Sequence, residues 1–264
     1  MGTITKALTL LNLFSANRTE MGLAEIVRLS GRDKATVHRH LVELQENGFL
    51  EQHPVTRAYR LGPALLRLSA VREAAFPIRA LLRPIVTELA EATGELAHAS
   101  LLQGNILSPL IFHDPRAHGV QVHFDQSEML PLHATSSGLA VLAFSTGDYL
   151  KDYLSGRLDA HTAHTPTDPE RLTRLIDETR QTGLGRLDGA FDAEVSSEGA
   201  AVFGPDGMPV GAISVAVPTV RAKPDKMAEI GDALLEAAQT ATHSLGGKWA
   251  APLCPSRLGS SASA

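Results

Sequence analysis

The stretch that decides the fold runs from Leu23 to Leu61 and reads LAEIVRLSGRDKATVHRHLVELQENGFLEQHPVTRAYRL. It begins with apolar side chains at helical spacing, and Ser30-Gly31 breaks that pattern with a turn. Asp33 stands where a helix N-cap belongs. A second apolar stripe follows at Val37, Leu41 and Leu44. The stretch therefore predicts two helices joined by a sharp turn.

The second half of this stretch predicts a β-hairpin. Asn47-Gly48 is typical of a helix end. The extended runs 49–52 and 58–61 then flank a loop of five residues. Before the stretch, an amino-terminal helix is expected from an apolar stripe at Ile4, Ala7, Leu8, Leu11 and Phe14. Three helices followed by a hairpin make a winged helix-turn-helix.

The third helix carries basic and small side chains near its start and acidic ones near its end. A recognition helix enters the major groove with its first residues, where helix N–H groups also favour phosphate. Arg39 can bond to guanine with two N–H groups, and Arg57 at the hairpin tip suits a phosphate or minor-groove contact. The expected DNA contacts are Arg32, Lys34, Thr36, His38, Arg39 and Arg57. A solvated basic helix on a protein–protein adaptor is the alternative.

Charge divides unevenly along the 264 residues. Residues 1–74 hold 10 Lys and Arg against 7 Asp and Glu, whereas residues 75–264 hold 14 against 22. A basic segment joined to an acidic remainder is typical of a polyanion reader fused to a second function. The single cysteine, Cys254, excludes an intramolecular disulfide and a multi-thiolate metal cluster. Without a bilayer-length apolar run or a secretory signal, a cytoplasmic protein that makes no membrane contact is expected.

Residues beyond 62 predict a linker helix and a second domain of mixed strands and helices. The expected domains are the winged helix at 1–62, a linker helix at 63–77 and a second domain at 78–246, while composition predicts a disordered tail at 247–264. The fold class is α+β with two domains. Within the second domain we expect a helix ending at Thr93, a hairpin over 95–112, a half-buried strand at 120–125, helices at 136–144, 169–182 and 226–244, and a hairpin over 200–217.

Small hydroxyl residues gather at 133–138, where the helix at 136–144 begins. Free backbone N–H groups and the helix dipole favour an anionic group there. A helix cap without any ligand explains the same residues equally well.

The run 23–69 resembles the DNA-binding domain of IclR-family bacterial transcriptional regulators. Four later runs resemble the ligand-binding domain of that family, in the same order: RPIVTELAEATGE (83–95), PLHATSSGLAVLAF (131–144), TPTDPERLTRLIDETRQTGLG (165–185) and GPDGMPVGAISVAVP (204–218). The resemblance covers about residues 4–246. It implies a GAF-like α/β domain built on an antiparallel sheet that binds a small organic effector. It also implies a homodimer joined through the amino-terminal domains, or a dimer of dimers.

By resemblance, the effector-binding residues are Ala134, Thr135, Ser136, Ser137, Asp188, Phe191, Ser197 and Ser214. Three positions depart from the family pattern. Ser197 replaces a cysteine, Glu194 a glycine and Glu198 an aliphatic residue. The acidic position of the family falls on Leu187 or, with a shift of one residue, on Asp188. Carboxylates near the pocket would repel a dicarboxylate and suit a polyol, an amine or a hydroxylated aromatic; for Glu194, an exposed loop position is favoured.

These features predict a ligand-responsive DNA-binding regulator, in which the effector shifts the population of domain placements through the linker helix. No cofactor is expected. A Ser/His hydrolase is the least favoured alternative, because His133 near Ser136 and Ser137 comes without a G-x-S-x-G elbow or an orienting acid. A metal-responsive regulator with His, Asp and Glu ligands is another alternative. Its candidate histidines are His113, His118, His123, His133, His161 and His164.

Overall fold

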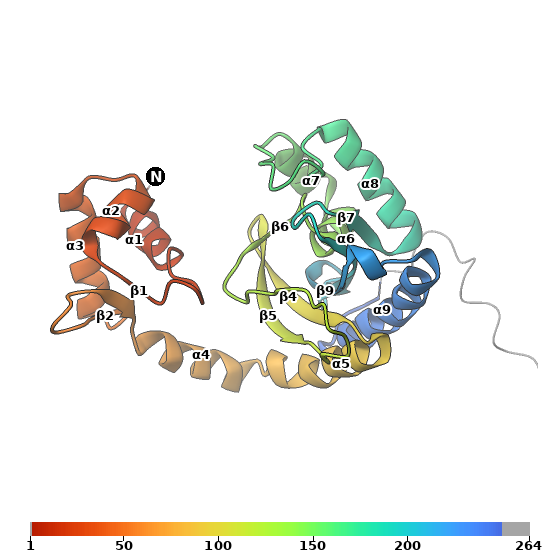
Figure 1. The fold of residues 1–264 in the computed structure, drawn as a ribbon, viewed down its shortest axis with the longest axis horizontal. Helices are drawn as coiled ribbons and strands as arrows, with labels where there is room; N and C mark the ends of the chain where they lie inside the picture. Colours follow the sequence, from red (N-terminus) through yellow and green to blue (C-terminus); the bar gives the residue numbers. More distant parts are fainter. Residues whose placement is uncertain (1, 250–264) are drawn as a thin grey trace, which may run out of the picture. The chain divides into compact units, whose positions relative to one another are not determined.

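A computed structural model describes residues 2–249 of the protein (Figure 1). The chain forms two compact units that divide between Pro77 and Ile78. Within the described residues, no helix has the length and apolar character needed to cross a membrane.

The amino-terminal unit is a winged helix-turn-helix, as the sequence predicts. Its three antiparallel strands lie in the order β1-β3-β2. The two-residue strand β1 was not predicted, because so short a segment has no alternating pattern. The elements are α1 (Thr3–Leu11), β1 (Glu20–Met21), α2 (Leu23–Ser30), α3 (Lys34–Glu46), β2 (Leu50–Gln52), β3 (Tyr59–Leu61) and α4 (Ala64–Ala75).

Local signals set the turn of this unit. Gly31 has a φ of 63°, the left-handed conformation that ends α2, and the Asp33 carboxylate accepts the N–H of Thr36 at 2.8 Å. The stripes of α2 and α3 meet in one core, which contains Ile26, Val37, Leu41, Leu44, Leu50 and Tyr59.

The predicted apolar stripe of α1 is confirmed in part. Phe14 is buried, and Ala7 and Leu11 pack against the core, but Ile4 and Leu8 are exposed. Leu10, which was not in the predicted stripe, is buried in the same core. Packing of α1 against α3 therefore turns the buried face of the helix towards Leu10.

The carboxyl-terminal unit is an α+β domain on a six-stranded antiparallel sheet in the order β6-β5-β4-β9-β8-β7. The predicted hairpins and long helices are all present. The elements are α5 (Ile78–Thr93), β4 (Leu96–Gln103), β5 (Ile106–His113), β6 (Leu130–Pro131), α6 (Ser136–Phe144), α7 (Gly147–Leu154), α8 (Pro169–Thr182), β7 (Gly185–Asp188), β8 (Val195–Phe203), β9 (Pro209–Pro218), η1 (Thr219–Arg221) and α9 (Pro224–Ser244).

Helices cover both faces of this sheet. One face packs on α5 and α9 through small and branched side chains such as Ala97, Ile213 and Val215. The other face packs on α6, which α8 contacts in turn. Because α6 lies between the sheet and α8, its residues from Ser136 to Ala143 are all buried.

Three details differ from the sequence predictions. The expected strand at 120–125 is irregular, because β6 takes the sheet edge beside β5. Helix α7, capped by Thr146, was not predicted. In the predicted tail, the Trp249 ring packs edge-on against Phe203 at 5.6 Å, so disorder is the wrong prediction for 247–249, while 250–264, with Cys254, lie outside the described residues.

Candidate functional site

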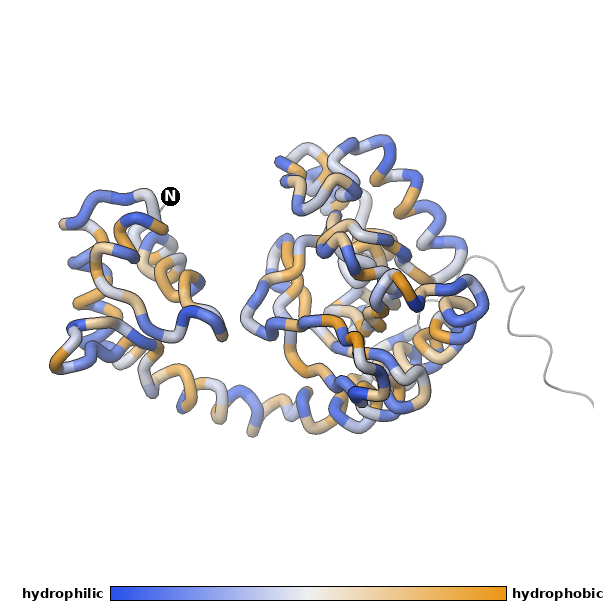
Figure 2. The backbone as a smooth tube through the Cα atoms, viewed as in Figure 1, coloured by the Kyte–Doolittle hydropathy of each residue, from blue (hydrophilic) through white to orange (hydrophobic). Residues whose placement is uncertain are grey.

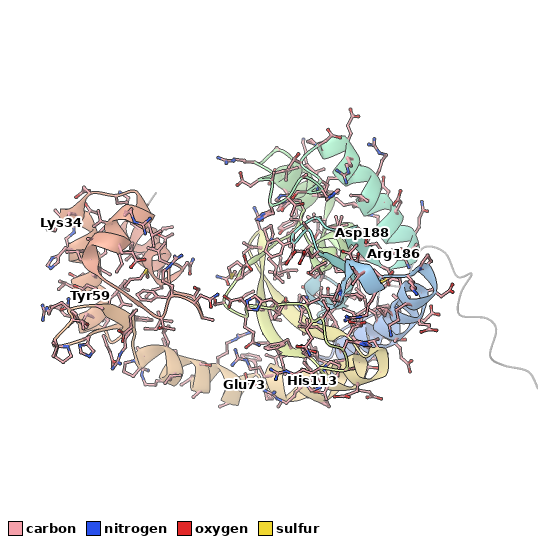
Figure 3. All side chains as sticks on the ribbon, viewed as in Figure 1. Lys34, Tyr59, Glu73, His113, Arg186 and Asp188 are labelled. Carbon is pink, nitrogen blue, oxygen red and sulfur yellow. The ribbon has the colours of Figure 1, made fainter. Side chains whose placement is uncertain are left out.

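The start of α3 presents polar and basic side chains to solvent. Lys34, which Figure 3 labels, is exposed, as are His38 and Arg39, and Thr36 is half-buried. The N–H of Thr36 donates to Asp33, and this bond holds the pKa of the Asp33 carboxyl below its usual value. The structure thus brings four of the predicted DNA contacts together over about one and a half helical turns.

Arg32 is arranged differently from the prediction. Its Nη1 donates to the carbonyl of Lys6 and its Nη2 to the hydroxyl of Thr9 at 3.0 Å. The guanidinium therefore ties α1 to the turn before α3. Sequence spacing could not separate this bracing arginine from a DNA-contacting one, because the difference depends on where α1 lies.

The hairpin tip presents Arg57 in a turn held by side chains. Arg57 has a φ of 60°, and the side chain of Gln52 donates to its carbonyl at 2.9 Å. His53 Nδ1 accepts the N–H groups of Val55 and Thr56, both at 3.2 Å. These bonds fix the tip so that the exposed Arg57 side chain projects from it.

The carboxyl-terminal unit contains a cavity of about 420 Å³ beside the start of α6. Six of the eight predicted effector residues line it: Ala134, Thr135, Ser136, Ser137, Phe191 and Ser197. Its other lining residues are His98, Val122, His123, Phe124, Asp125, Glu128, Leu130, Thr162, Leu187, Ala190, Asp192, Ala193, Val195 and Ala216. The volume lies within the range of about 300–1,000 Å³ that is typical of small-molecule sites.

Two glycines let the start of α6 lie directly on the sheet. A Cβ at Gly185 would lie 2.3 Å from the carbonyl oxygen of Ser136, and one at Gly199 would lie 2.5 Å from the nitrogen of Ser137. The Thr135 hydroxyl accepts the N–H of Gly138 at 3.1 Å. The N–H groups of Ser136 and Ser137 bond to no residue in 2–249, so they remain available to a ligand.

Asp188 and Ser214 do not line the cavity, contrary to the prediction. Leu187 pairs with Ser197, and both line the cavity; the next residue, Asp188, points to the opposite face of the strand and is exposed (Figure 3). The alternative alignment, with Leu187 at the family's acidic position, therefore matches the cavity. Ser214 is buried beside Gly199, with its hydroxyl lacking a hydrogen-bond partner.

Glu198 is a buried carboxylate under α9. Its Oε1 accepts a hydrogen bond from Arg186 Nε at 2.6 Å, and its Oε2 has no hydrogen-bond partner. Burial raises the pKa of Glu198 despite this partner. Glu198 is buried, whereas Glu194 is exposed, as the sequence favoured.

Sequence reasoning missed His98 and Phe124. The His98 ring is buried, lines the cavity, stacks on Phe124 at 4.6 Å and lies 3.3 Å from the Ser100 hydroxyl. Burial lowers the pKa of His98 to about 4, so the ring is neutral at pH 7. The available signal was the alternation of small apolar Ala97 and Ala99 with polar His98 and Ser100.

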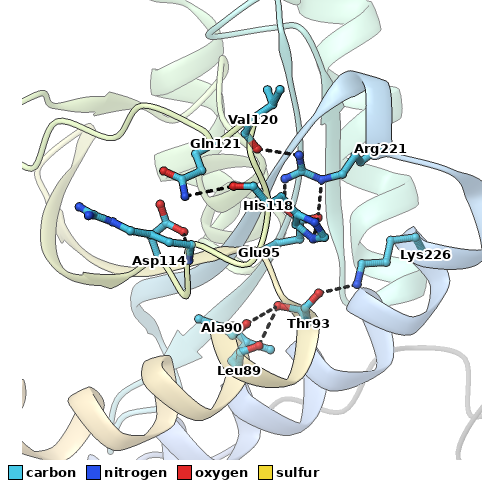
Figure 4. Close-up of polar contacts among 11 residues, drawn as sticks. Leu89, Ala90, Thr93, Glu95, Asp114, His118, Val120, Gln121, Arg221 and Lys226 are labelled. Carbon is cyan, nitrogen blue, oxygen red and sulfur yellow. Dashed lines mark hydrogen bonds and ion pairs between the residues drawn. The ribbon is translucent and has the colours of Figure 1, made fainter.

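The irregular segment 114–129 forms one wall of the cavity. Arg221 bonds to the backbone of this segment, as Figure 4 shows. Arg221 donates to both carboxylate oxygens of the buried Glu95, at 3.0 and 2.7 Å, and to the carbonyl of Val120 at 2.6 Å. His118 Nε2 lies 3.7 Å from the same carboxylate. The Glu95–Arg221 pair thus joins the turn before β4, η1 and the cavity wall.

His133 holds a loop and does not approach the serines of α6. Its Nδ1 lies 2.9 Å from the Tyr153 hydroxyl, and its Nε2 lies 2.9 Å from the carbonyl of Asp159. Both ring nitrogens therefore bond to groups other than Ser136 and Ser137, so His133 is not placed as the base that the hydrolase alternative assigned to it. In residues 2–249, no three His, Cys, Asp or Glu side chains are placed to hold a metal ion.

Two family models match the chain. One is described as the IclR helix-turn-helix domain and matches residues 3–54. The other is described as the bacterial transcriptional regulator IclR C-terminal domain and matches residues 73–243.

Curated relatives and solved structures are similar along most of the chain. The HTH-type transcriptional regulator BhcR of Paracoccus denitrificans is 31% identical over 89% of this chain and 84% of its own. The glycerol operon regulatory protein of Streptomyces griseus is 30% identical, over 84% and 87%. A putative IclR regulator from Silicibacter sp. TM1040 is 45% identical, with a TM-score of 0.85 over 94% and 98%. An IclR homologue of Microbacterium hydrocarbonoxydans complexed with 4-hydroxybenzoate is 25% identical, with a TM-score of 0.74 over 92% and 99%.

Proposed function

Since the chain belongs to the IclR family of bacterial transcriptional regulators, we propose that α3 and its hairpin bind operator DNA while the cavity beside α6 binds the controlling effector. A DNA-binding domain joined to an effector-binding domain is the organisation of this family. The observation that carries the proposal is the cavity itself, because unbonded helix N–H groups and buried hydroxyls meet there in a unit separate from the winged helix.

The proposed DNA contacts are Lys34, Thr36, His38 and Arg39 of α3 and Arg57 of the hairpin. The exposure of Lys34, His38, Arg39 and Arg57 supports this assignment, and the half-buried Thr36 lies among the first three. Arg32 is left out, because its guanidinium braces α1. Arg39 reads a base edge in this proposal, and Lys34 and Arg57 contact phosphates.

The proposed effector is a small organic molecule held by the first turn of α6. The relative complexed with 4-hydroxybenzoate supports a ligand of this size. The proposed contacts are Thr135, Ser136 and Ser137, with Ala134, Phe191 and Ser197 as walls. The protein is proposed to act by binding alone, without a catalytic step, because His133 is held away from the serines.

We also propose that two copies associate through α1 and α4, as a homodimer or as half of a dimer of dimers. Exposed apolar side chains on these helices support this: Ile4 and Leu8 on α1, and Leu66, Leu68 and Val71 on α4. Figure 2 shows hydrophobic segments along the tube of α4. Apolar patches of this kind are typical of association surfaces. Effector binding would then shift the population of recognition-helix spacings, with α4 as the connection.

A bulky side chain at Ser137 tests the effector site. Ser137→Phe should fill the cavity and abolish the thermal stabilisation that a hit from a screen of small carboxylates, phenols, sugars and amines gives the wild-type protein. Specific DNA binding should persist, because Ser137 lies in the other unit. An unchanged response to the hit in Ser137→Phe would place the effector elsewhere.

Substitution of Arg39 tests the DNA-binding face. Operator sequences can be selected from randomised duplexes with the full chain. Arg39→Ala should weaken binding to the selected sequence by roughly 10- to 100-fold and binding to random DNA much less. Arg174→Ala, an exposed arginine of α8, is the charge-matched control. Equal losses on both DNAs would mean that Arg39 contacts only phosphate.

A further inference from the structure

The carboxylates at the mouth of the cavity bear on the charge of the effector. Asp125, Glu128 and Asp192 line the cavity, and no lysine or arginine is among its lining residues in the described chain. Of the two lining histidines, His98 is neutral and His123 is exposed at the rim. The mouth therefore has a negative potential that opposes an anion carrying two charges.

The floor of the cavity has the opposite polarity. Thr135, Ser136 and Ser137 are buried there, and the N–H groups of Ser136 and Ser137 lie at the positive end of the α6 dipole. Glu128 and Asp192, by contrast, are exposed at the mouth. The cavity thus favours an accepting or anionic group inside and a cationic group at the entrance.

Aromatic rings also line the cavity. Phe124 stacks on His98, and Phe191 packs against His161 with ring centroids 5.0 Å apart. Both phenylalanines line the cavity. An ammonium group near the face of such a ring gains a favourable cation–π contact, which adds to its attraction to the carboxylates.

We propose that the effector is a small zwitterion, with an anionic group at the first turn of α6 and a protonated amine or quaternary ammonium at the carboxylate mouth. This inference rests on the proposed effector function of the cavity. It adds the second charge of the ligand and excludes dicarboxylates from the effectors of this protein.

Three matched probes test the proposal on the full chain: benzoate, benzylamine and 4-(aminomethyl)benzoate. Titration calorimetry at low salt should give the zwitterion the tightest binding, with benzoate weaker by up to roughly fivefold, because one exposed ion pair contributes up to about that factor. Raising the salt concentration should weaken the zwitterion more than benzoate. Benzoate binding as tightly as the zwitterion, or absence of binding by both amines, would overturn the proposal.

A second experiment replaces two of the carboxylates at the mouth with amides. Glu128→Gln with Asp192→Asn should weaken the zwitterion by up to roughly fivefold, and should strengthen benzoate. Asp192→Asn keeps an oxygen that can accept the N–H of Glu194, and Asp125 is left in place because it accepts two bonds from Ser127. Glu178→Gln, at an exposed position of α8, is the matched control and should change neither affinity. If the double variant binds the zwitterion as tightly as the wild type does, the mouth carboxylates do not bind its ammonium group and the proposal is wrong.

The effector site and the charge of its ligand are tested by different outcomes. If an anion binds the wild-type cavity, is lost in Ser137→Phe and outcompetes both amines, the effector site stands and the zwitterion proposal is wrong. If Ser137→Phe leaves the binding of every probe unchanged, the effector function of the cavity is itself wrong.

Discussion

At the scale of single residues, His98 shows how a cavity wall can depend on protonation. Its ring lies between Phe124 and the sheet, with Ser100 as its hydrogen-bonding neighbour. Burial disfavours the charged imidazolium, so folding requires the neutral ring. In the unfolded chain the same ring protonates near its ordinary pKa of 6.5.

Stability should therefore fall as the pH falls from 6.5 towards 4, because the unfolded state binds the extra proton. Between pH 7 and pH 5 the loss assigned to His98 is about 2 kcal/mol. Urea unfolding of wild type and His98→Asn at both pH values measures it, since the variant lacks this contribution. Equal pH dependence of the two proteins would show that the His98 pKa is not lowered.

The sequence predicted the cavity-lining residues at the start of α6, but it could not predict which strand side chains face the cavity. The lining residues 134–137 could be recognised in the sequence because they are consecutive and lie at the start of one helix. Asp188 was assigned to the wrong face, since a shift of one residue reverses the direction of every side chain in a strand. His98 enters the cavity only because β4 lies beside β9, and this pairing joins residues more than a hundred positions apart.

At the scale of elements, the contact between α6 and β8 depends on the absence of a side chain. Gly199→Ala would place a Cβ 2.5 Å from the nitrogen of Ser137 and 2.6 Å from the carbonyl carbon of Ser136. We expect a loss of about 1–3 kcal/mol in the free energy of unfolding, because backbone atoms must move. Weaker effector binding should accompany it.

Gly147→Ala is the control for this substitution, because nothing lies within 4 Å of the added methyl. Its unfolding free energy should stay within about 0.5 kcal/mol of wild type or rise. Urea unfolding and thermal shift with effector compare the two variants. A fully stable Gly199→Ala protein would mean that α6 is not held at this distance.

The ion pair between Arg221 of η1 and Glu95, just before β4, gives a second prediction at this scale. Arg221→Gln leaves the carboxylate of Glu95 buried without its guanidinium, at a cost of about 3 kcal/mol. Residues 114–129 should then be cleaved faster by proteases, because Val120 also loses its bond to Arg221. The Glu95→Gln, Arg221→Gln double variant should lose less than the two single losses combined. Additive losses would contradict a direct pair.

Elements with strong end signals were predicted well and the others were not. Asp168 caps α8 and Gly183 ends it in the left-handed conformation, as predicted from the sequence. The alternation at 120–125 was misleading, because a strand also needs a free sheet edge, and β6 takes the one beside β5. Pairing of this kind is a property of the assembled domain.

At the scale of the whole molecule, the order of domains followed from the sequence because each has its own periodicity and charge. Self-association did not follow, because the apolar face of α4 could equally have packed inside the chain. In the amino-terminal unit Leu68 and Val71 are 42% and 62% exposed, one turn apart. These side chains are free to contact a second copy.

Leu68→Glu with Val71→Glu should disperse the proposed dimer. Each change acts twice in a symmetric interface, so the dissociation constant should rise by roughly tenfold or more. Light scattering over a concentration series measures it, and circular dichroism checks that the exposed positions leave the fold intact. Val55→Glu, at the exposed hairpin tip, is the control. If the dissociation constant does not change, Leu68 and Val71 do not form the dimer interface.

The two ends of the cavity come from different kinds of backbone, and this matters for how such proteins diversify. Its floor is a helix start that lies on two glycines, where a Cβ at Gly185 or Gly199 would collide with the backbone of α6. Its entrance is drawn largely from an irregular segment that tolerates new side chains. Descendants of this protein can therefore acquire sensitivity to new metabolites by changes at the entrance alone, while inheriting the anchoring helix unaltered.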